Sequence, residues 1–141
     1  MSKVAVVYWS GTGNTAAMAQ AIADGAKEKG AEVSLLTSAE FDESSIDVYD
    51  AVAFGCPSMG TEELEDTEFA PMFEGCKAKL SGKKIALFGS YGWGDGEWMR
   101  NWEEECISLG AIMATDFVIC CGTPGEEGLE SCEGMGAILA Q

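Results

Sequence analysis

Residues 4–15 read VAVVYWSGTGNT and join a run of apolar residues to a loop of glycines and hydroxyls. The run at residues 4–8 is continuous and rich in valine, which is typical of a strand buried on both faces of a parallel sheet. Residues 15–29 follow as TAAMAQAIADGAKEK and predict a helix. A strand, a glycine loop and a helix in this order predict an anion site, because the glycines admit a ligand close to backbone N–H groups and the helix N-terminus adds unpaired donors.

The loop at residues 10–15 contains no basic residue. Its polar side chains are those of Ser10, Thr12, Asn14 and Thr15. The missing lysine argues against a nucleotide-triphosphate P-loop, and Ala16 stands where the dinucleotide fingerprint has its third glycine. We therefore interpret the loop as a phosphate site built from neutral donors, in preference to a turn that only caps the helix.

Five apolar runs alternate with helical segments along the chain. The predicted strands are residues 3–9, 31–37, 51–55, 84–89 and 111–119, and the predicted helices are 15–29, 67–80, 97–109 and 129–139, with a short weak helix near 43–48. This alternation predicts one α/β domain over residues 1–141, a doubly wound five-stranded parallel sheet of order 2-1-3-4-5 with helices on both faces. In the last helix Gly134 and Gly136 each cost about 1 kcal/mol relative to alanine, so we expect tertiary packing to hold it.

Composition limits the functions that this chain can have. Among 141 residues, 24 are acidic, 8 are basic and none is histidine, which gives a net charge of −16. This charge argues against nucleic acid and anionic membranes as partners and favours basic protein surfaces. The longest apolar runs reach about half of what a bilayer requires and no signal peptide opens the chain, so we expect a cytoplasmic monomer.

The six cysteines do not follow the spacing of zinc or iron–sulfur sites. They lie at positions 56, 76, 106, 120, 121 and 132. We interpret them as reduced thiols that pack as small apolar side chains. Cys56 and the pair Cys120–Cys121 fall at predicted strand ends, where a role in binding or oxidation stays open.

Ligands of such a sheet bind at the carboxyl ends of the strands, so the loops at residues 10–15, 56–62 and 90–96 should meet there. In the second loop Met59 stands next to a glycine, and in the third Trp93 stands between two glycines. These side chains either fold back onto the core or cover a flat, polarisable ligand. We favour the second reading, in which the loops bind a planar ring joined to a phosphate, FMN in preference to NAD or ATP.

The three loops together resemble those of the flavodoxin family, in particular the short-chain flavodoxins of anaerobic bacteria. The resemblance rests on WSGTGNT (9–15), GCPSMGTEELED (55–66) and FGSYGWGDGEWM (88–99), spans nearly the whole chain and fades after Gly110. It implies non-covalently bound FMN and a low-potential carrier of single electrons without substrate turnover of its own. The alternative is an FMN-dependent NAD(P)H reductase on the same fold, but the loops offer no basic residue to a nicotinamide phosphate.

The resemblance also implies a role for each loop. Residues 10–15 hold the phosphate with Trp9 close by, Met59 and Trp93 flank the isoalloxazine, and Glu62 pairs with the flavin N3–H. Backbone groups of the third loop meet the pyrimidine edge and the ribityl chain. The expected cofactor-binding residues are Ser10, Gly11, Thr12, Gly13, Asn14, Thr15, Ser58, Met59, Gly60, Thr61, Glu62, Ser90, Tyr91, Gly92, Trp93 and Gly94. We expect no catalytic residue and no metal ligand.

Acidic residues surround the predicted site. They are Glu62, Glu63, Glu65, Asp66, Glu68, Asp95 and Glu97. Together with a phosphate that no cation neutralises, they disfavour the anion of the fully reduced flavin, and a few kcal/mol of repulsion lowers the potential of the second electron by about 100–200 mV. The same acids are expected to form a rim on which basic redox proteins dock.

The turn at residues 59–62 leads to a prediction about the flavin semiquinone. The resemblance places Gly60 opposite flavin N5, with its carbonyl turning toward N5–H in the semiquinone. The third residue of a type II turn needs a positive φ, which the β-branched Thr61 adopts poorly. Thr61→Gly and Thr61→Asn are therefore expected to raise the semiquinone fraction in a spectroscopic redox titration. An unchanged or smaller fraction would contradict this.

Overall fold

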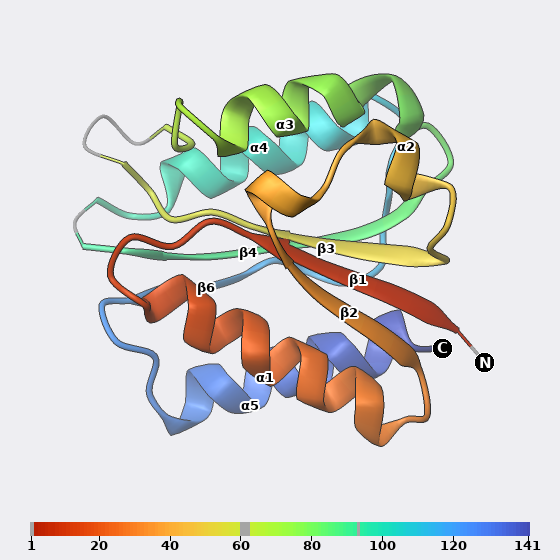
Figure 1. Ribbon diagram of the computed structural model, residues 1–141. Coiled ribbons are helices and arrows are strands. Elements are labelled where there is room, and N and C mark those ends of the chain that lie inside the picture. Colours follow the sequence, from red (N-terminus) through yellow and green to blue (C-terminus); the bar gives the residue numbers. More distant parts are fainter. Residues whose placement is uncertain (1, 60–62, 93) are drawn as a thin grey trace.

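A parallel sheet lies between two layers of helices in the computed structural model, which describes residues 2–59, 63–92 and 94–141 (Figure 1). The strands are β1 (Lys3–Tyr8), β2 (Glu32–Thr37), β3 (Ala51–Gly55), β4 (Lys84–Tyr91), β5 (Ile112–Met113) and β6 (Val118–Cys121). The α-helices are α1 (Asn14–Glu28), α2 (Glu43–Ile46), α3 (Phe69–Cys76), α4 (Glu97–Ser108) and α5 (Glu126–Leu139). Short 3-10 helices follow β2 at Ser38–Glu40 and α3 at Lys77–Lys79.

The strand order confirms the predicted doubly wound fold. The sheet runs β2-β1-β3-β4-β5, β6 also pairs with β4, and all pairings are parallel. β1 lies between β2 and β3, so that Val6 is opposite Leu35 on one side and Ala53 on the other. Helices α1 and α5 cover one face of the sheet, and α3 and α4 cover the other (Figure 1).

The last predicted strand is divided in two. Residues 111–119 were expected to form one strand, but β5 pairs with the start of β4 and β6 pairs with its end. The segment between them contains Thr115 and Asp116, and aspartate is unfavourable in strands. The fifth strand position is therefore shared by two short segments, which leaves the order of the sheet unchanged.

Several element boundaries also differ from those predicted, and β4 runs two residues further than expected, to Tyr91. The helix expected at residues 67–80 is α-helical only over Phe69–Cys76 and continues as a 3-10 turn. The helix expected at residues 129–139 begins earlier, at Glu126. Glu126 and Glu127 lie in its first turn, where negative charge interacts favourably with the helix dipole. These two acids could have indicated the earlier start of the helix.

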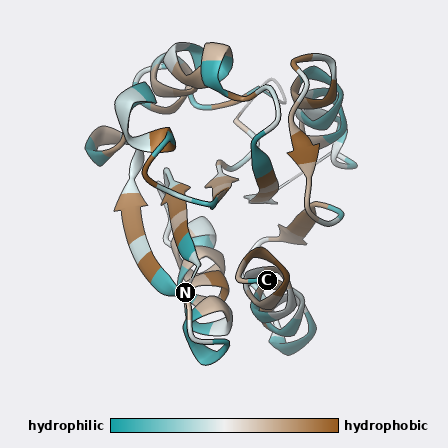
Figure 2. Ribbon diagram, turned by 90° about the vertical axis from the view of Figure 1, so that its right-hand side faces the viewer, coloured by the Kyte–Doolittle hydropathy of each residue, from teal (hydrophilic) through white to brown (hydrophobic). Residues whose placement is uncertain are grey.

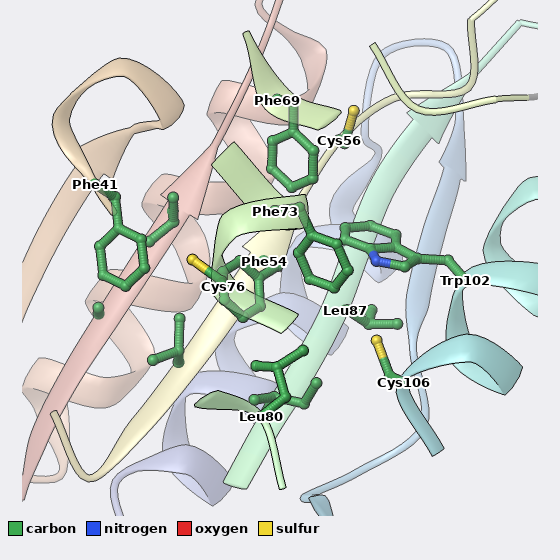
Figure 3. Close-up of a cluster of buried hydrophobic side chains, with 14 of the residues drawn as sticks. Phe41, Phe54, Cys56, Phe69, Phe73, Cys76, Leu80, Leu87, Trp102 and Cys106 are labelled. Atoms are coloured by element: carbon green, nitrogen blue, oxygen red, sulfur yellow. The ribbon is translucent and has the colours of Figure 1, made fainter. Parts of the chain in front are cut away.

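The layer between the sheet and helices α3 and α4 is aromatic (Figure 3). Phe54 meets Phe73 edge to face with ring centres 5.2 Å apart, and Phe69 meets Trp102 in the same way at 5.4 Å. Each such pair contributes about 0.5–1.5 kcal/mol beyond the area that it buries. The thiols of Cys76 and Cys106 fill space around these rings and are fully buried, as expected for cysteines that pack as apolar side chains.

Hydrophobic residues concentrate on the strands and on the helix faces that meet them, while the outer helix faces are hydrophilic (Figure 2). No helix in the described part of the chain has the length and hydropathy needed to cross a bilayer. Both ends of the chain lie at the edge where the strands begin, opposite the loops that follow β1 and β3 (Figure 1). There the backbone oxygen of Gln141 accepts a hydrogen bond from Lys84 Nζ at 2.9 Å.

Helices α1 and α5 pack with their backbones in close contact. A Cβ atom on Gly25 would lie 2.1 Å from the carbonyl oxygen of Glu133, and one on Gly136 would lie 2.0 Å from that of Ile22. Gly136 therefore costs helix propensity but permits this close approach, which explains how a helix with three internal glycines, Gly128, Gly134 and Gly136, is held. Gly134 has no such role, because a Cβ there would meet nothing within 4 Å.

This contact predicts opposite effects for two glycines of the same helix. Gly136→Ala is expected to lower the free energy of unfolding by about 1–3 kcal/mol through overpacking, and Gly25→Ala should do the same from α1. Gly134→Ala is expected to raise it by about 0.5–1 kcal/mol, because alanine is the better helix former. Urea unfolding of the three variants measures this. Equal effects of Gly134→Ala and Gly136→Ala would show that the close contact is unimportant.

Candidate functional site

Three loops meet where β1, β3 and β4 end, as the strand order predicts. Backbone hydrogen bonds continue the sheet into them: Trp9 N–H donates to the Gly55 oxygen at 3.1 Å, and Cys56 N–H donates to the Phe88 oxygen at 3.1 Å. Further out, Ser58 N–H donates to the Ser90 oxygen at 3.0 Å. The second loop is thus fastened to the third and extends from the sheet beside it.

These loops enclose a pocket of about 250 Å³. Its walls are formed by Trp9, Gly11, Thr12, Asn14, Pro57, Ser58, Met59, Ser90, Tyr91, Gly92 and Gly122. Most of these residues were expected to bind the cofactor. The predicted cofactor-binding residues did not include Pro57 and Gly122. Gly122 directly follows β6, and its place at the carboxyl end of a strand on this edge could have indicated it. Met59 lines the pocket and is 36% exposed.

The first loop is shaped by its own hydroxyls. Ser10 Oγ accepts hydrogen bonds from the N–H of Gly13 at 3.0 Å and of Ala16 at 3.3 Å, and Thr12 Oγ1 accepts one from the N–H of Asn14 at 3.4 Å. Gly13 precedes α1 with a φ of 95°, a left-handed conformation that favours glycine. The loop therefore turns sharply into the helix and brings the N-terminus of α1 beside the pocket, where an anion is stabilised.

Thr15, in the first turn of α1, and Ser90, near the end of β4, are hydrogen-bonded to each other at the edge of the sheet that carries the pocket. Their hydroxyl oxygens are 2.9 Å apart, and Ser90 N–H also donates to Thr15 Oγ1 at 3.3 Å. Both residues are buried, with 1% and 5% of their surface exposed. The two expected site residues thus form a cross-link between the start of α1 and the end of β4.

Some of the expected site residues are not described. Gly60, Thr61, Glu62 and Trp93 lie outside the described residues, so the predicted contacts to the ring and to N3–H and N5 stay predictions. Next to them, Gly94 has a φ of 86° in the left-handed region, where a larger side chain would be strained.

Glu65 was expected on the acidic rim, but the structure buries it. Only 4% of the residue is exposed, and its carboxylate accepts hydrogen bonds from the N–H groups of Thr67 at 2.9 Å, Glu68 at 2.8 Å and Phe69 at 2.9 Å. The Thr67 hydroxyl also donates to it. Glu65 therefore satisfies backbone donors at the start of α3, and sequence alone does not distinguish such an inward acid from its exposed neighbours.

The surroundings of Glu65 act on its charge in opposite directions. Burial alone raises the pKa of this carboxyl group. The hydrogen bonds from the Thr67 hydroxyl and from the three N–H groups favour the ionised form and outweigh burial, so the pKa falls from 4.5 to about 2. Glu65 is therefore ionised at neutral pH although little of it is exposed.

The rest of the described rim is exposed as expected. Glu63, Asp66 and Glu97 are exposed, Glu68 accepts a hydrogen bond from Trp9 Nε1 at 3.1 Å, and Asp95 pairs with Arg100 at 3.1 Å. Within the described ranges, no group of three or more Cys, Asp and Glu side chains is placed to hold a metal ion.

A larger hollow, of about 410 Å³, lies between α3 and α4 next to the second loop. Its walls are formed by Glu63, Leu64, Asp66, Ala70, Phe73, Glu74, Lys77, Trp98, Asn101, Trp102 and Glu105. Lys77 Nζ pairs with Glu74 at 2.7 Å and with Glu105 at 2.9 Å, which uses the only cation among these lining residues. The acids that line it, with their one cation already paired, make it unsuitable for phosphate.

Comparison with known proteins gives a consistent result. A family profile described as Flavodoxin matches residues 6–135. The chain is 42% identical over 135 residues to a flavodoxin of Clostridium beijerinckii, covering 96% of this chain and 97% of that one. It is 49% identical over 119 residues to a flavodoxin of Megasphaera elsdenii, covering 82% and 85%. The solution structure of the two-electron reduced Megasphaera elsdenii flavodoxin superposes with a TM-score of 0.90 over 97% of this chain and 98% of that chain, at 42% identity.

The carboxylate of Glu65 predicts a pH dependence of stability. Because its pKa is lowered in the folded state, it stabilises the fold fully above about pH 4.5, and this contribution is lost as the pH falls toward 2. Glu65→Gln is expected to lower the free energy of unfolding by about 1.5–3 kcal/mol at pH 7, with a smaller difference from wild type at pH 4. Urea unfolding at fixed FMN concentration measures it.

Asp66→Asn is the matched control for this prediction. It removes the same charge from the adjacent, exposed residue and is expected to change stability by less than about 0.5 kcal/mol. If Glu65→Gln and Asp66→Asn proved equal at pH 7, the capping role of Glu65 would be refuted.

Proposed function

The chain belongs to the flavodoxin family, which consists of FMN-binding electron-transfer proteins, and on that premise we propose that it carries single electrons at low potential on non-covalently bound FMN. One observation carries the proposal. The pocket of about 250 Å³ lies at the carboxyl ends of the strands, between three loops and beside the N-terminus of α1. When bound there, FMN supplies the one-electron redox chemistry.

The first loop is proposed to hold the phosphate. The residues that would do so are Ser10, Gly11, Thr12, Gly13, Asn14 and Thr15. In support, the Ser10 hydroxyl accepts backbone N–H groups within and just after the loop, and the loop leads directly into α1. Such a site binds a dianion through neutral donors and the helix end, so it leaves the phosphate charge in place.

The second and third loops are proposed to hold the flavin ring and the ribityl chain. The residues assigned to this role are Ser58, Met59, Gly60, Thr61, Glu62, Ser90, Tyr91, Gly92, Trp93 and Gly94. Met59 and Tyr91 line the pocket with apolar surface, which suits a planar ring. Neither histidine nor any basic side chain is among the described lining residues.

This charge distribution is the argument for a low potential. Exposed carboxylates of Glu63, Asp66 and Glu97 lie near the loops, and the whole chain carries a net charge of −16. An added negative charge on the ring is repelled by these groups and by the uncompensated phosphate. A reduced flavin bound here would therefore give up its electron more readily than one in a neutral site.

The same features favour a carrier over an enzyme. An NAD(P)H reductase needs groups that receive a nicotinamide nucleotide, and the described pocket lining offers no cation for its phosphates. We therefore propose that the isolated protein has no substrate turnover of its own and exchanges electrons only with other redox proteins.

The partners are proposed to be basic redox proteins that dock on the acidic rim around the flavin. The hollow between α3 and α4 extends this surface, since Glu63 and Asp66 stand at its mouth beside the second loop. Attraction between opposite charges speeds the encounter, and repulsion between two acidic copies favours a monomer. Five buried thiols and one exposed thiol among the free cysteines fit a reducing compartment, and we propose the cytoplasm.

This proposal predicts how the reduced protein reacts with a basic acceptor. A basic c-type cytochrome mixed with dithionite-reduced holoprotein should be reduced rapidly at about 10 mM ionic strength and much more slowly at about 0.5 M, because salt screens the docking charges. Stopped-flow absorbance measures the rate. The holoprotein alone should oxidise NADPH at a rate close to zero under anaerobic conditions, and steady NADPH turnover would favour the reductase instead.

Two pairs of charge variants separate docking from net charge. Glu63→Gln with Asp66→Asn is expected to lower the low-salt rate several-fold. Glu28→Gln with Glu32→Gln removes two exposed acids at the opposite end of the molecule, between α1 and β2, and should change it little. Equal effects of the two pairs would place docking elsewhere.

A further inference from the structure

The second loop is closed at its base by a hydrogen bond in the interior of the protein. Cys56 directly follows β3, and Glu65 stands four residues before α3. The N–H of Glu65 donates to Cys56 Sγ at 3.3 Å. Both residues are buried, Cys56 completely, and Figure 3 shows Cys56 at the margin of the aromatic cluster.

Cys56 is held in place by the elements around it. Its N–H donates to the Phe88 oxygen of β4 at 3.1 Å, and its own oxygen accepts from Trp98 Nε1 of α4 at 3.2 Å. A Cβ on Gly89 would lie 2.2 Å from that oxygen, so β4 approaches Cys56 as closely as a backbone can. Desolvation raises the pKa of the Cys56 thiol to about 12, which keeps the sulfur protonated and neutral at pH 7.

Glu65 is fixed just as firmly on the other side. Its carboxylate accepts the N–H groups of Thr67, Glu68 and Phe69 and thereby joins it to the start of α3. The bond between Cys56 and Glu65 therefore connects two points that are each anchored to a different part of the fold. Between them, the described part of the loop carries one internal backbone bond, from Met59 N–H to the Glu63 oxygen at 2.9 Å, and a longer one from Ser58 Oγ to the Met59 oxygen at 3.5 Å.

Building on the FMN-binding function proposed above, we propose that Cys56 is a positioning residue: its sulfur accepts the Glu65 amide, joins the two ends of the second loop at its base and fixes the orientation in which Met59 meets the cofactor. The bond is local, because sulfur is a weak acceptor and the surrounding core is held by many other contacts. Its loss loosens the loop far more than it destabilises the molecule. The thiol therefore has a role that the other buried thiols of the same layer lack.

Cys56→Ala removes the acceptor, and Cys76→Ala is the matched control. Cys76 is also fully buried in the aromatic layer, but its thiol donates to Met72 Sδ of its own helix at 3.7 Å. Both variants should lower the free energy of unfolding. Only Cys56→Ala is expected to speed amide hydrogen exchange at Met59, by about tenfold, and to raise the FMN dissociation constant by a similar factor. Exchange is measured by NMR on the holoprotein, and affinity by the flavin fluorescence released on dilution.

Three further variants test whether the acceptor itself matters. Cys56→Ser keeps an atom that accepts the Glu65 amide and should restore Met59 exchange and FMN affinity to within about twofold of wild type. If Cys56→Ala does not yield folded protein, Cys56→Thr and Cys56→Val provide the same comparison at equal size, with the hydroxyl variant expected to be the tighter binder. The proposal is overturned if Cys56→Ala and Cys76→Ala behave alike at Met59, or if the hydroxyl variants bind FMN no better than the apolar ones.

Discussion

The pairing of β1 with β2 on one side and β3 on the other is the constraint on which the rest of the structure depends. Because both pairings are parallel, the loops after β1 and β3 leave the sheet at the same edge. One loop then turns into α1 on one face, and the other turns toward α3 on the opposite face (Figure 1). Their divergence leaves a pocket, and β4 supplies its third wall through Ser90 and Tyr91.

The two layers that support this edge are packed by different means. On one side, aromatic rings meet edge to face and thiols fill the remaining space. On the other side, α1 and α5 approach until glycine is required at their crossing. Helix α1 is thereby held against α5, and the second loop is anchored to the aromatic layer through Cys56 and Leu64. The pocket lies between one support of each kind.

The sequence predicted the strand order and the meeting of the three loops, because both depend on local patterns: long apolar runs, glycines after strands and the alternation of strand with helix. It did not predict features that depend on distant partners. The inward carboxylate of Glu65 has the same sequence surroundings as exposed Asp66, and only the position of α3 distinguishes them. From the sequence, Gly136 only lowers the helix propensity of α5, and its packing role depends on the backbone of Ile22 in α1. Four expected site residues, among them Trp93 and Glu62, lie outside the described part of the chain.

The position of the chain ends has a practical consequence. Gln141 lies beside the start of β4, at the far side of the molecule from the pocket. A tether attached there, to a bead, an electrode or another protein, would leave the loop edge directed outward and free to meet soluble proteins. The fold thus separates the part by which the molecule can be attached from the part through which it exchanges electrons.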